Sequence, residues 1–199
     1  MAGNTKDERD FCINLFPDLG TDNYFRVNSD CDYRYNCIGF AIGYTDIWVA
    51  PFPRKIPTKD DISLRIIPWF WWPNVVPFDE NPCSLVRTFE YFGFETCDDD
   101  SIEPNYDKVA LYSHMGKWTH AARIIDEGVY HSKLGECFDI IHRKGNVLEQ
   151  TTNPMDSYGK PFVFMRRKKA DQSILSTKRP PMGLIRFAGY VFKYMTPSY

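Results

Sequence analysis

The stretch KVALYSHMGKWTHAARIIDEGVYHS, residues 108–132, predicts three β-strands in quick succession. Apolar residues alternate or run together over 108–113, 119–125 and 129–132, as they do in strands. The loop DEG between the last two runs is a good hairpin connection. Two further candidate strands follow, FDIIH at 138–142 and PFVFMRR at 161–167.

Two helices are predicted before these strands. NCIGFAIG is short and apolar; it begins near Asn36 and ends at Gly43, because glycine commonly follows the last residue of a helix. In NPCSLVRTFEYFGF, Asn81 can cap the helix and Pro82 suits its first position. Helices first and antiparallel strands after them predict the α+β class.

A proline- and aromatic-rich run, residues 44–78, separates the two helices. Prolines inside IIPWFWWPNVVPF forbid a regular helix, so we expect a long ordered loop or an edge strand. Aromatic side chains that close the core are the favoured interpretation over a lipid contact. A third interpretation is a cleft wall, which makes Trp71 and Trp72 candidate substrate-binding residues.

The length of 199 residues suits one domain with a single core. We expect an N-terminal arm over 1–30, the domain over 31–167, and a linker followed by a C-terminal helix over 168–199. Apolar residues at helical spacing predict that last helix within MGLIRFAGYVFKYM. Packing on the domain is favoured for it, with a membrane-surface or partner helix as the alternative.

Composition excludes several classes of protein. The net charge of −2 argues against a nucleic-acid binder, which normally needs a basic stripe. The N-terminus has no apolar stretch of signal-peptide length, so a soluble, cytoplasmic protein is expected, and delivery elsewhere stays open. Six scattered cysteines in such a chain predict free thiols and no disulfide framework.

Cys37 is the candidate nucleophile. At the first turn of a helix, amide groups and the helix dipole stabilise a thiolate. A small buried core thiol is the competing interpretation. A nucleophilic thiolate needs a base that also protonates the leaving group, for which histidine is the usual residue.

Four histidines are available as the base. His120 opens a strand and is preferred, since a rigid sheet holds its geometry. His131 lies across the predicted hairpin near the level of His120, where it would orient the imidazole. His142 is the second choice for that orienting role. His114 lies on a turn and is the weakest candidate.

The motifs NCIGFA and HAARIIDEGVYHS resemble those of the NlpC/P60 and broader papain-like thiol hydrolases. The resemblance implies a papain-like fold in which Cys37 attacks an amide or ester carbonyl, His120 is the base and His131 orients it. The chain departs from that pattern by Asn36, where aspartate is common, and by the aromatic insertion. The blocks YNCIGFAIG, WWP, THAAR and SKLGE also resemble an uncharacterised, mostly bacterial family, which implies no activity.

The segment HSKLGE adds two candidates for the site. Lys133 could hold a carboxylate or phosphate of the substrate, and Glu136 could orient a histidine; an exposed ion pair on a turn is the alternative. The spacing of cysteines and histidines does not match a zinc site, and no nucleotide-binding glycine motif occurs. We therefore expect neither a metal nor a cofactor.

Two functions remain open from the sequence. The first is a cysteine-dependent amide hydrolase or acyltransferase acting on a peptide or protein through Cys37, His120 and His131. The alternative is a non-catalytic binding module of the same fold, used in bacterial conflict or immunity. Under the alternative, Cys37 would be dispensable and the tryptophans Trp69, Trp71 and Trp72 would be essential.

Overall fold

The two helices and five strands that the sequence predicts in its domain are present in the predicted order, together with further short elements. The computed structural model describes residues 4–51, 69–143 and 145–179. Its helices are α1 (Lys6–Leu15), η1 (Pro17–Thr21), α2 (Cys37–Ile42), α4 (Pro82–Tyr91), η2 (Pro154–Asp156), η3 (Lys169–Ser173) and α5 (Ile174–Thr177). Its strands are β1 (Arg26–Val27), β2 (Ile47–Val49), β3 (Trp69–Trp71), β4 (Glu95–Cys97), β5 (Tyr106–His114), β6 (Lys117–Asp126), β7 (Val129–Lys133), β8 (Asp139–Arg143) and β9 (Lys160–Lys168).

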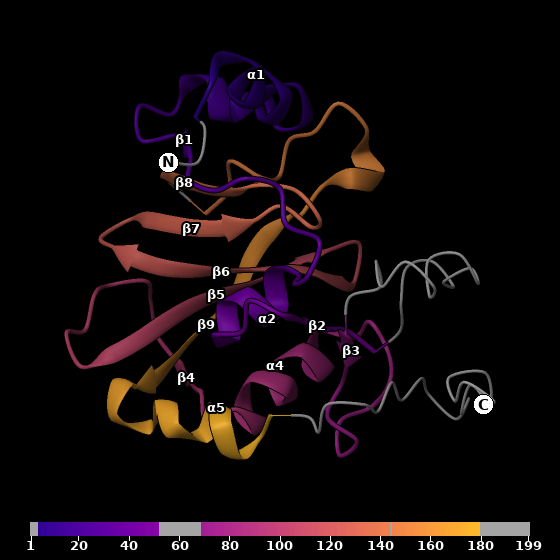
Figure 1. Ribbon diagram of the computed structural model, residues 1–199, viewed down its shortest axis with the longest axis vertical. Coiled ribbons are helices and arrows are strands. Elements are labelled where there is room, and N and C mark those ends of the chain that lie inside the picture. The colour runs from indigo at the N-terminus through magenta and orange to yellow at the C-terminus, as the bar shows by residue number, and fades with distance from the viewer. Residues whose placement is uncertain (1–3, 52–68, 144, 180–199) are drawn as a thin grey trace, which may run out of the picture.

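Seven strands form one sheet in the order β1-β8-β7-β6-β5-β9-β4 (Figure 1). Each neighbouring pair is antiparallel, so a mixed fold of helices and antiparallel sheet is confirmed. The five strands predicted from the sequence are β5 to β9. The prediction missed β1 and β4, because two or three residues are too few to show an alternating pattern.

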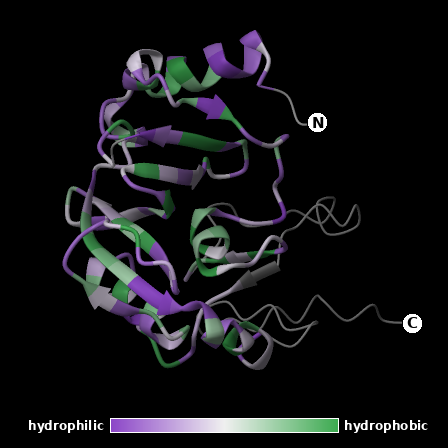
Figure 2. Ribbon diagram, turned by 90° about the vertical axis from the view of Figure 1, so that its left-hand side faces the viewer, coloured by the Kyte–Doolittle hydropathy of each residue, from purple (hydrophilic) through white to green (hydrophobic). Residues whose placement is uncertain are grey.

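Helix α2 is buried against one face of the sheet. All six of its residues are buried, as expected for a helix that is apolar on every side, and its ribbon is coloured hydrophobic along most of its length in Figure 2. Cys37 and Ile38 share a core with Leu111 of β5 and Ala121 of β6. The Nε group of Arg123 donates to the carbonyl oxygen of Phe40 at 2.8 Å, which ties the helix to β6.

The predicted helix boundaries are confirmed for α2 and α4. The side chains of Asn36 and Asn81 accept hydrogen bonds from the first-turn amides, and Pro82 is the first residue of α4. Gly43 ends α2 with φ of 129°, a conformation that side chains disfavour.

The ends of the described chain pack on opposite ends of the sheet (Figure 1). The expected N-terminal arm is α1, η1 and β1; Cys12 and Leu19 anchor it in a second core, and β1 is the edge strand beside β8. The expected linker, at the start of 168–199, instead contains η3 and α5, and the hydroxyl of Tyr44 donates to the carbonyl oxygen of Leu175 at 2.8 Å. The predicted C-terminal helix lies outside the described residues.

The aromatic run forms part of a small second sheet. Strands β2 and β3 pair in parallel, and the residues 52–68 between them lie outside the described part of the chain. Trp72 is 4% exposed and stacks on Trp118, with 5.9 Å between ring centroids. The interpretation of these aromatic residues as closing the core is therefore confirmed for Trp72.

Candidate functional site

The first turn of α2 is held by one buried side chain. The Oδ1 atom of Asn36 accepts from the amides of Gly39 at 2.9 Å and Val49 at 3.1 Å, and its Nδ2 group donates to the carbonyl oxygen of Val49 at 3.0 Å. Asn36 thus caps the helix and pairs with β2 as a backbone strand would. This double role fixes Cys37 as the first helical residue, beside β2.

Cys37 opens onto a cleft of about 820 Å³. The cleft lies between the start of α2, the β5–β6 hairpin, the turn after β7 and the loop before β9. Its polar lining includes Asn36, Glu80, His114, Lys117, Thr119, Asp156 and Ser157. Its apolar lining includes Leu15, Phe16, Trp48, Met115, Trp118, Leu134, Met155 and Tyr158. Cys37 itself is 7% exposed, so its thiol belongs to the cleft wall and to the core at once.

The structure does not bring His120 to Cys37. Neighbouring residues of a strand point to opposite faces of the sheet. Ala121 faces the core that contains Cys37, whereas the ring of His120 packs against Tyr112 and Tyr158 on the other face, with centroids 5.2 and 4.3 Å away. His120 is fully buried there. The predicted Cys37–His120 pair is therefore not formed; it failed because strand position alone does not reveal which face a side chain occupies.

His120 belongs instead to a buried chain of hydrogen bonds. Its Nε2 atom lies 3.0 Å from Oγ of Ser132, and that oxygen lies 2.8 Å from Nε2 of His142. All three residues have no exposed surface. Burial, reinforced by the nearby His142, holds the pKa of His120 well below its usual range, so the ring is neutral at pH 7. A neutral, sealed imidazole of this kind supports the sheet and has no access to a substrate.

His131 lies on the same face of the sheet as α2, but beside the middle of the helix. His131 pairs with Arg123 and not with His120, so its partner on β6 lies three residues further along the chain than the sequence predicts. Its ring meets that of Phe40 edge-on at 4.7 Å, and its Nε2 atom lies 3.4 Å from Nδ2 of Asn28. Burial first, and then the charge of Arg123, lowers the pKa of His131 to about 4. His131 and His120 are thus on opposite faces, and neither orients the other.

His114 is the one histidine of the four, all of which lie in the described residues, that lines the cleft with Cys37. It ends β5 opposite Lys117 and is half-buried. The sequence interpretation ranked it last because it stands next to a turn. The signal that could have found it is that turn: Met115 and Gly116 have positive φ, which makes a tight hairpin, and His114, Met115 and Lys117 at its end all line the cleft.

The expected substrate-binding residues take structural positions. Trp71 packs its ring against those of Tyr91 and Phe92, at 5.8 and 5.5 Å, and neither Trp71 nor Trp72 lines the cleft. Lys133 is fully buried, its Nζ group donates to the carbonyl oxygen of Cys137, and burial lowers its pKa.

The HSKLGE segment still reaches the cleft through other residues. Glu136 is exposed on the turn after β7, and it does not line the cleft. Leu134 and Gly135, from the same segment, do line it. Lys133 is therefore a buried structural residue and Glu136 an exposed one, and Leu134 and Gly135 between them line the cleft.

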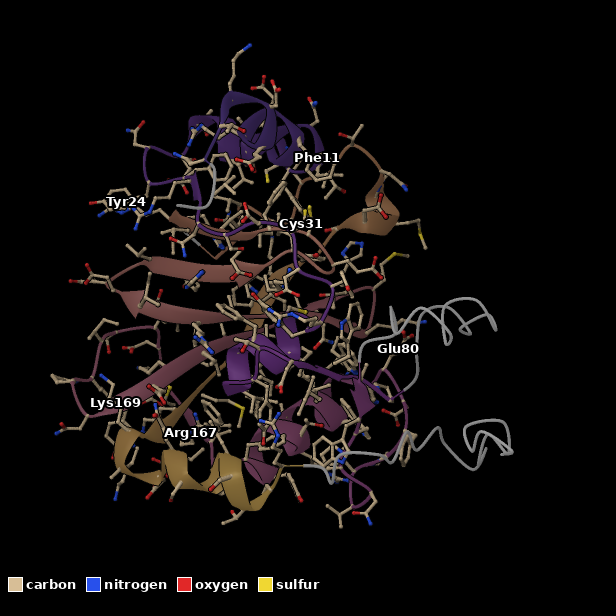
Figure 3. The ribbon with its side chains drawn as sticks, viewed as in Figure 1. Phe11, Tyr24, Cys31, Glu80, Arg167 and Lys169 are labelled. Atoms are coloured by element: carbon tan, nitrogen blue, oxygen red, sulfur yellow. The ribbon has the colours of Figure 1, made fainter. Side chains whose placement is uncertain are left out.

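Charges at the cleft mouth are partly paired. The Nζ group of Lys117 lies 2.5 Å from a carboxylate oxygen of Glu80, and the amide of Trp118 donates to the Glu80 carbonyl oxygen at 2.9 Å. Figure 3 labels Glu80 beside the β5–β6 hairpin region.

Within residues 4–51, 69–143 and 145–179, no three His, Cys, Asp or Glu side chains cluster as a metal site would require. No helix in those same ranges is long and apolar enough to cross a membrane.

Comparison with known proteins finds one family. A family model described as a domain of unknown function, DUF7689, matches residues 26–166, which begin at β1 and end within β9. No curated protein and no solved structure matches the chain. The match spans the cleft-lining residues from Asn36 to Tyr158 and leaves α1 outside it.

Proposed function

The chain belongs to the DUF7689 family, and we propose that it is a thiol-dependent acyl-transfer enzyme that works in the Cys37 cleft with His114 as its base. The observation that carries the proposal is that Cys37 and His114 line one cleft from two different elements, α2 and the end of β5. A cysteine and a histidine across a groove are the parts that amide and ester hydrolysis by thiols requires. The papain-like fold and the peptide or protein substrate expected from the sequence are part of the same proposal.

The reaction assigns one role to each residue. His114 takes the proton from the Cys37 thiol, and the thiolate sulfur attacks the acyl carbonyl carbon to form a thioester. The protonated His114 then donates its proton to the leaving amine or alcohol, and water or a second nucleophile releases the acyl group. The six-residue α2 is too short to supply a large dipole, so the base is the main source of activation.

The rim of the cleft favours an apolar group on the substrate. Met115, in the turn between β5 and β6, and Met155, in η2, both line the cleft and are 79% and 78% exposed. Methionine side chains adapt to irregular apolar partners, and two such exposed residues are unusual on a polar rim. We therefore favour acyl compounds or peptides with an apolar side chain next to the reacting carbonyl.

Acylation by p-nitrophenyl acetate tests the proposal, because each acylated thiol releases one coloured p-nitrophenolate. Wild type is expected to show a burst of about one equivalent, and Cys37→Ala none. His114→Asn should slow the burst by roughly 100-fold, the usual range for loss of a general base. A burst that survives in Cys37→Ala, or an equal rate in His114→Asn, contradicts the proposal.

Ser132→Ala is the matched control for the predicted but unformed triad. It disturbs the His120 cluster on the far face of the sheet, and Ser132 itself does not line the cleft. If the variant remains folded by circular dichroism, its burst rate should stay within about twofold of wild type. A loss of the burst in folded Ser132→Ala would show that the reaction depends on the His120 cluster and would contradict the proposal.

A non-catalytic binding module is the second candidate, and one observation favours it: the sequence-predicted base is sealed on the other face of the sheet. Under this function, Cys37→Ala would bind its ligand as tightly as wild type. Acetylation of Cys37 in the burst assay, with dependence on His114, would rule in favour of the enzyme.

A further inference from the structure

A second pair of thiols lies outside the cleft, at the join between the segment after β1 and the turn between β7 and β8. The sulfur atoms of Cys31 and Cys137 are 2.8 Å apart, although the residues are 106 positions apart in the chain. A disulfide bond is about 2.05 Å long, so the two sulfurs have to approach by less than 1 Å to form one. We propose that Cys31 and Cys137 are a reversible disulfide pair that is oxidised by small disulfides such as glutathione disulfide.

Backbone contacts hold the two segments together on both sides of the pair. The amide of Asp32 donates to the carbonyl oxygen of Cys137 at 3.3 Å, and the amide of Asn28 donates to that of Asp139 at 2.8 Å. The amide of Asp139 in turn donates to Oγ of Ser29 at 2.9 Å. The segment carrying Cys31 therefore runs beside the β8 end of the turn, and closing the bond needs side-chain rotation without a large backbone movement.

The surroundings allow a reagent to reach the pair. Cys31 is exposed and Cys137 is half-buried, and Figure 3 labels Cys31 below α1. The ammonium group of Lys133 binds the Cys137 carbonyl oxygen, which places a positive charge near both sulfurs. Such a charge favours the thiolate that attacks a disulfide.

The chemistry balances in two exchange steps. One cysteine thiolate attacks a sulfur of glutathione disulfide, forms a mixed disulfide and releases one glutathione thiolate. The second cysteine then attacks the protein sulfur of the mixed disulfide and releases the second glutathione. Two protein thiols and one glutathione disulfide thus give one protein disulfide and two molecules of glutathione.

Although the residue as a whole is exposed, desolvation of its sulfur, and then the hydrogen bond to Cys137, outweighs the charge of Lys133 and raises the pKa of Cys31 to about 12. The thiol of Cys31 is therefore protonated at neutral pH, and we expect the exchange to speed up as the pH rises from 7 to 9. Cytosolic thiols are normally kept reduced, so the bond would close under oxidising conditions and reopen with excess glutathione.

The bond would join two walls of the cleft. The cleft is lined by Asn36 and Cys37, which follow Cys31 in the chain, and by Leu134 and Gly135, which precede Cys137. The inference goes beyond the proposed function and does not depend on it, since bond formation requires no reaction at Cys37.

Mass spectrometry of the intact chain tests the pair. After incubation with glutathione disulfide, the mass should fall by two hydrogen atoms, and digestion should yield one peptide joining Cys31 to Cys137. Excess glutathione should restore the original mass. A product that instead retains glutathione on Cys31 or Cys137, or joins Cys31 to the buried Cys12, overturns the proposal.

Two variants complete the test. Cys137→Ser should abolish the loss of two hydrogens and leave a glutathione adduct on Cys31. Cys83→Ser is the matched control, because Cys83 is an exposed cysteine on α4, and this variant should form the bond as wild type does. The oxidised wild type should also have a melting temperature several degrees above that of the reduced form, since the bond closes a long loop. If the melting temperature stays the same or falls when the bond forms, the bond is strained and non-native, and the proposal is overturned.

Discussion

The imidazole of His120 and the hydroxyl of Ser132 lie 3.0 Å apart on the face of the sheet opposite Cys37, and both side chains are fully buried. Ser132 also contacts His142 at 2.8 Å, so one hydroxyl joins two buried rings. A buried polar chain of this kind is stable only when its members keep their partners. The residues that looked catalytic in the sequence are therefore expected to govern stability.

Ser132→Ala should destabilise the fold by about 2–3 kcal/mol. The substitution leaves ring nitrogens of His120 and His142 buried without their shared partner, and an unsatisfied buried polar group costs about 1–3 kcal/mol. Urea denaturation at pH 7 measures the change. Ser176→Ala, at an exposed serine of α5, is the control and should change the free energy of unfolding by less than about 0.5 kcal/mol. Equal small effects would mean that the chain of hydrogen bonds contributes little.

Acid should destabilise the protein through His131. Burial lowers its pKa to about 4 in the folded state, whereas an unfolded histidine titrates near 6.5. Between those values the unfolded chain binds more protons, so stability is fully present above pH 6.5 and is lost as the pH falls toward 4. The loss should be on the order of 3 kcal/mol. The lowered pKa of His120 acts in the same direction.

His131→Asn isolates that contribution. Near pH 5 the variant should lose less stability per pH unit than wild type, by about 1 kcal/mol, because one proton uptake on unfolding is removed. Urea denaturation at pH 7.0, 6.0 and 5.0 gives the two slopes. Parallel slopes would show that His131 is not held neutral by the fold.

The sequence was sufficient for the longer elements of the domain but not for the sheet face on which each of their side chains lies. Period-two runs identified β5 to β9, and the Asn and Gly signals set the ends of α2, because these depend on neighbours in the chain. Which face His120 occupies depends on the register of β6 against β5, where a bulge shifts the pairing next to Tyr112. A shift of one residue exchanges the faces of a strand, so a local pattern could not decide between His120 and Thr119 as the residue lining the cleft.

Burial likewise escaped prediction at the charged and aromatic candidates. Lys133 was expected at a binding surface, yet its ammonium group satisfies a backbone carbonyl and lies 4.9 Å from the ring centre of Tyr35. The contact with Tyr35 joins residues 98 positions apart, for which a single sequence contains no signal. The Cys31–Cys137 contact was missed for the same reason.

Asn36→Ala should cost more stability than an ordinary cap. Asn36 is buried and makes three hydrogen bonds, two of them to Val49, so its removal leaves backbone groups of both α2 and β2 unsatisfied. We expect a loss of about 3 kcal/mol. Asn81→Ala is the matched control, because Asn81 is an exposed cap with a single bond to the amide of Cys83, and it should cost about 1 kcal/mol. Thermal and urea denaturation compare the two, and equal losses would contradict a bridging role for Asn36.

Asn36→Asp should also destabilise, although aspartate is a good cap. The carboxylate keeps both acceptor bonds but loses the Nδ2 donor and faces the carbonyl oxygen of Val49 with a negative charge. A loss of about 2 kcal/mol or more is expected at pH 7, and it should shrink as the pH falls toward 4, where the acid can protonate and donate. A loss independent of pH over that range would contradict the electrostatic cause.

Gly39→Ala should be the most damaging small change in α2. A Cβ atom built on Gly39 would lie 2.3 Å from the carbonyl oxygen of Ile47, a backbone atom that cannot rotate away. Helix α2 and β2 would have to separate, and overpacking of this kind costs about 3 kcal/mol, or a melting temperature lower by roughly 10 °C. Gly20→Ala is the matched control, since its Cβ would meet only two methyl groups of the Ile13 side chain, at 3.4 and 4.0 Å, and it should stay within about 1 kcal/mol of wild type. A Gly39→Ala protein as stable as the control would show that α2 and β2 are not in close contact, and with that the position of Cys37 at the cleft wall would no longer follow.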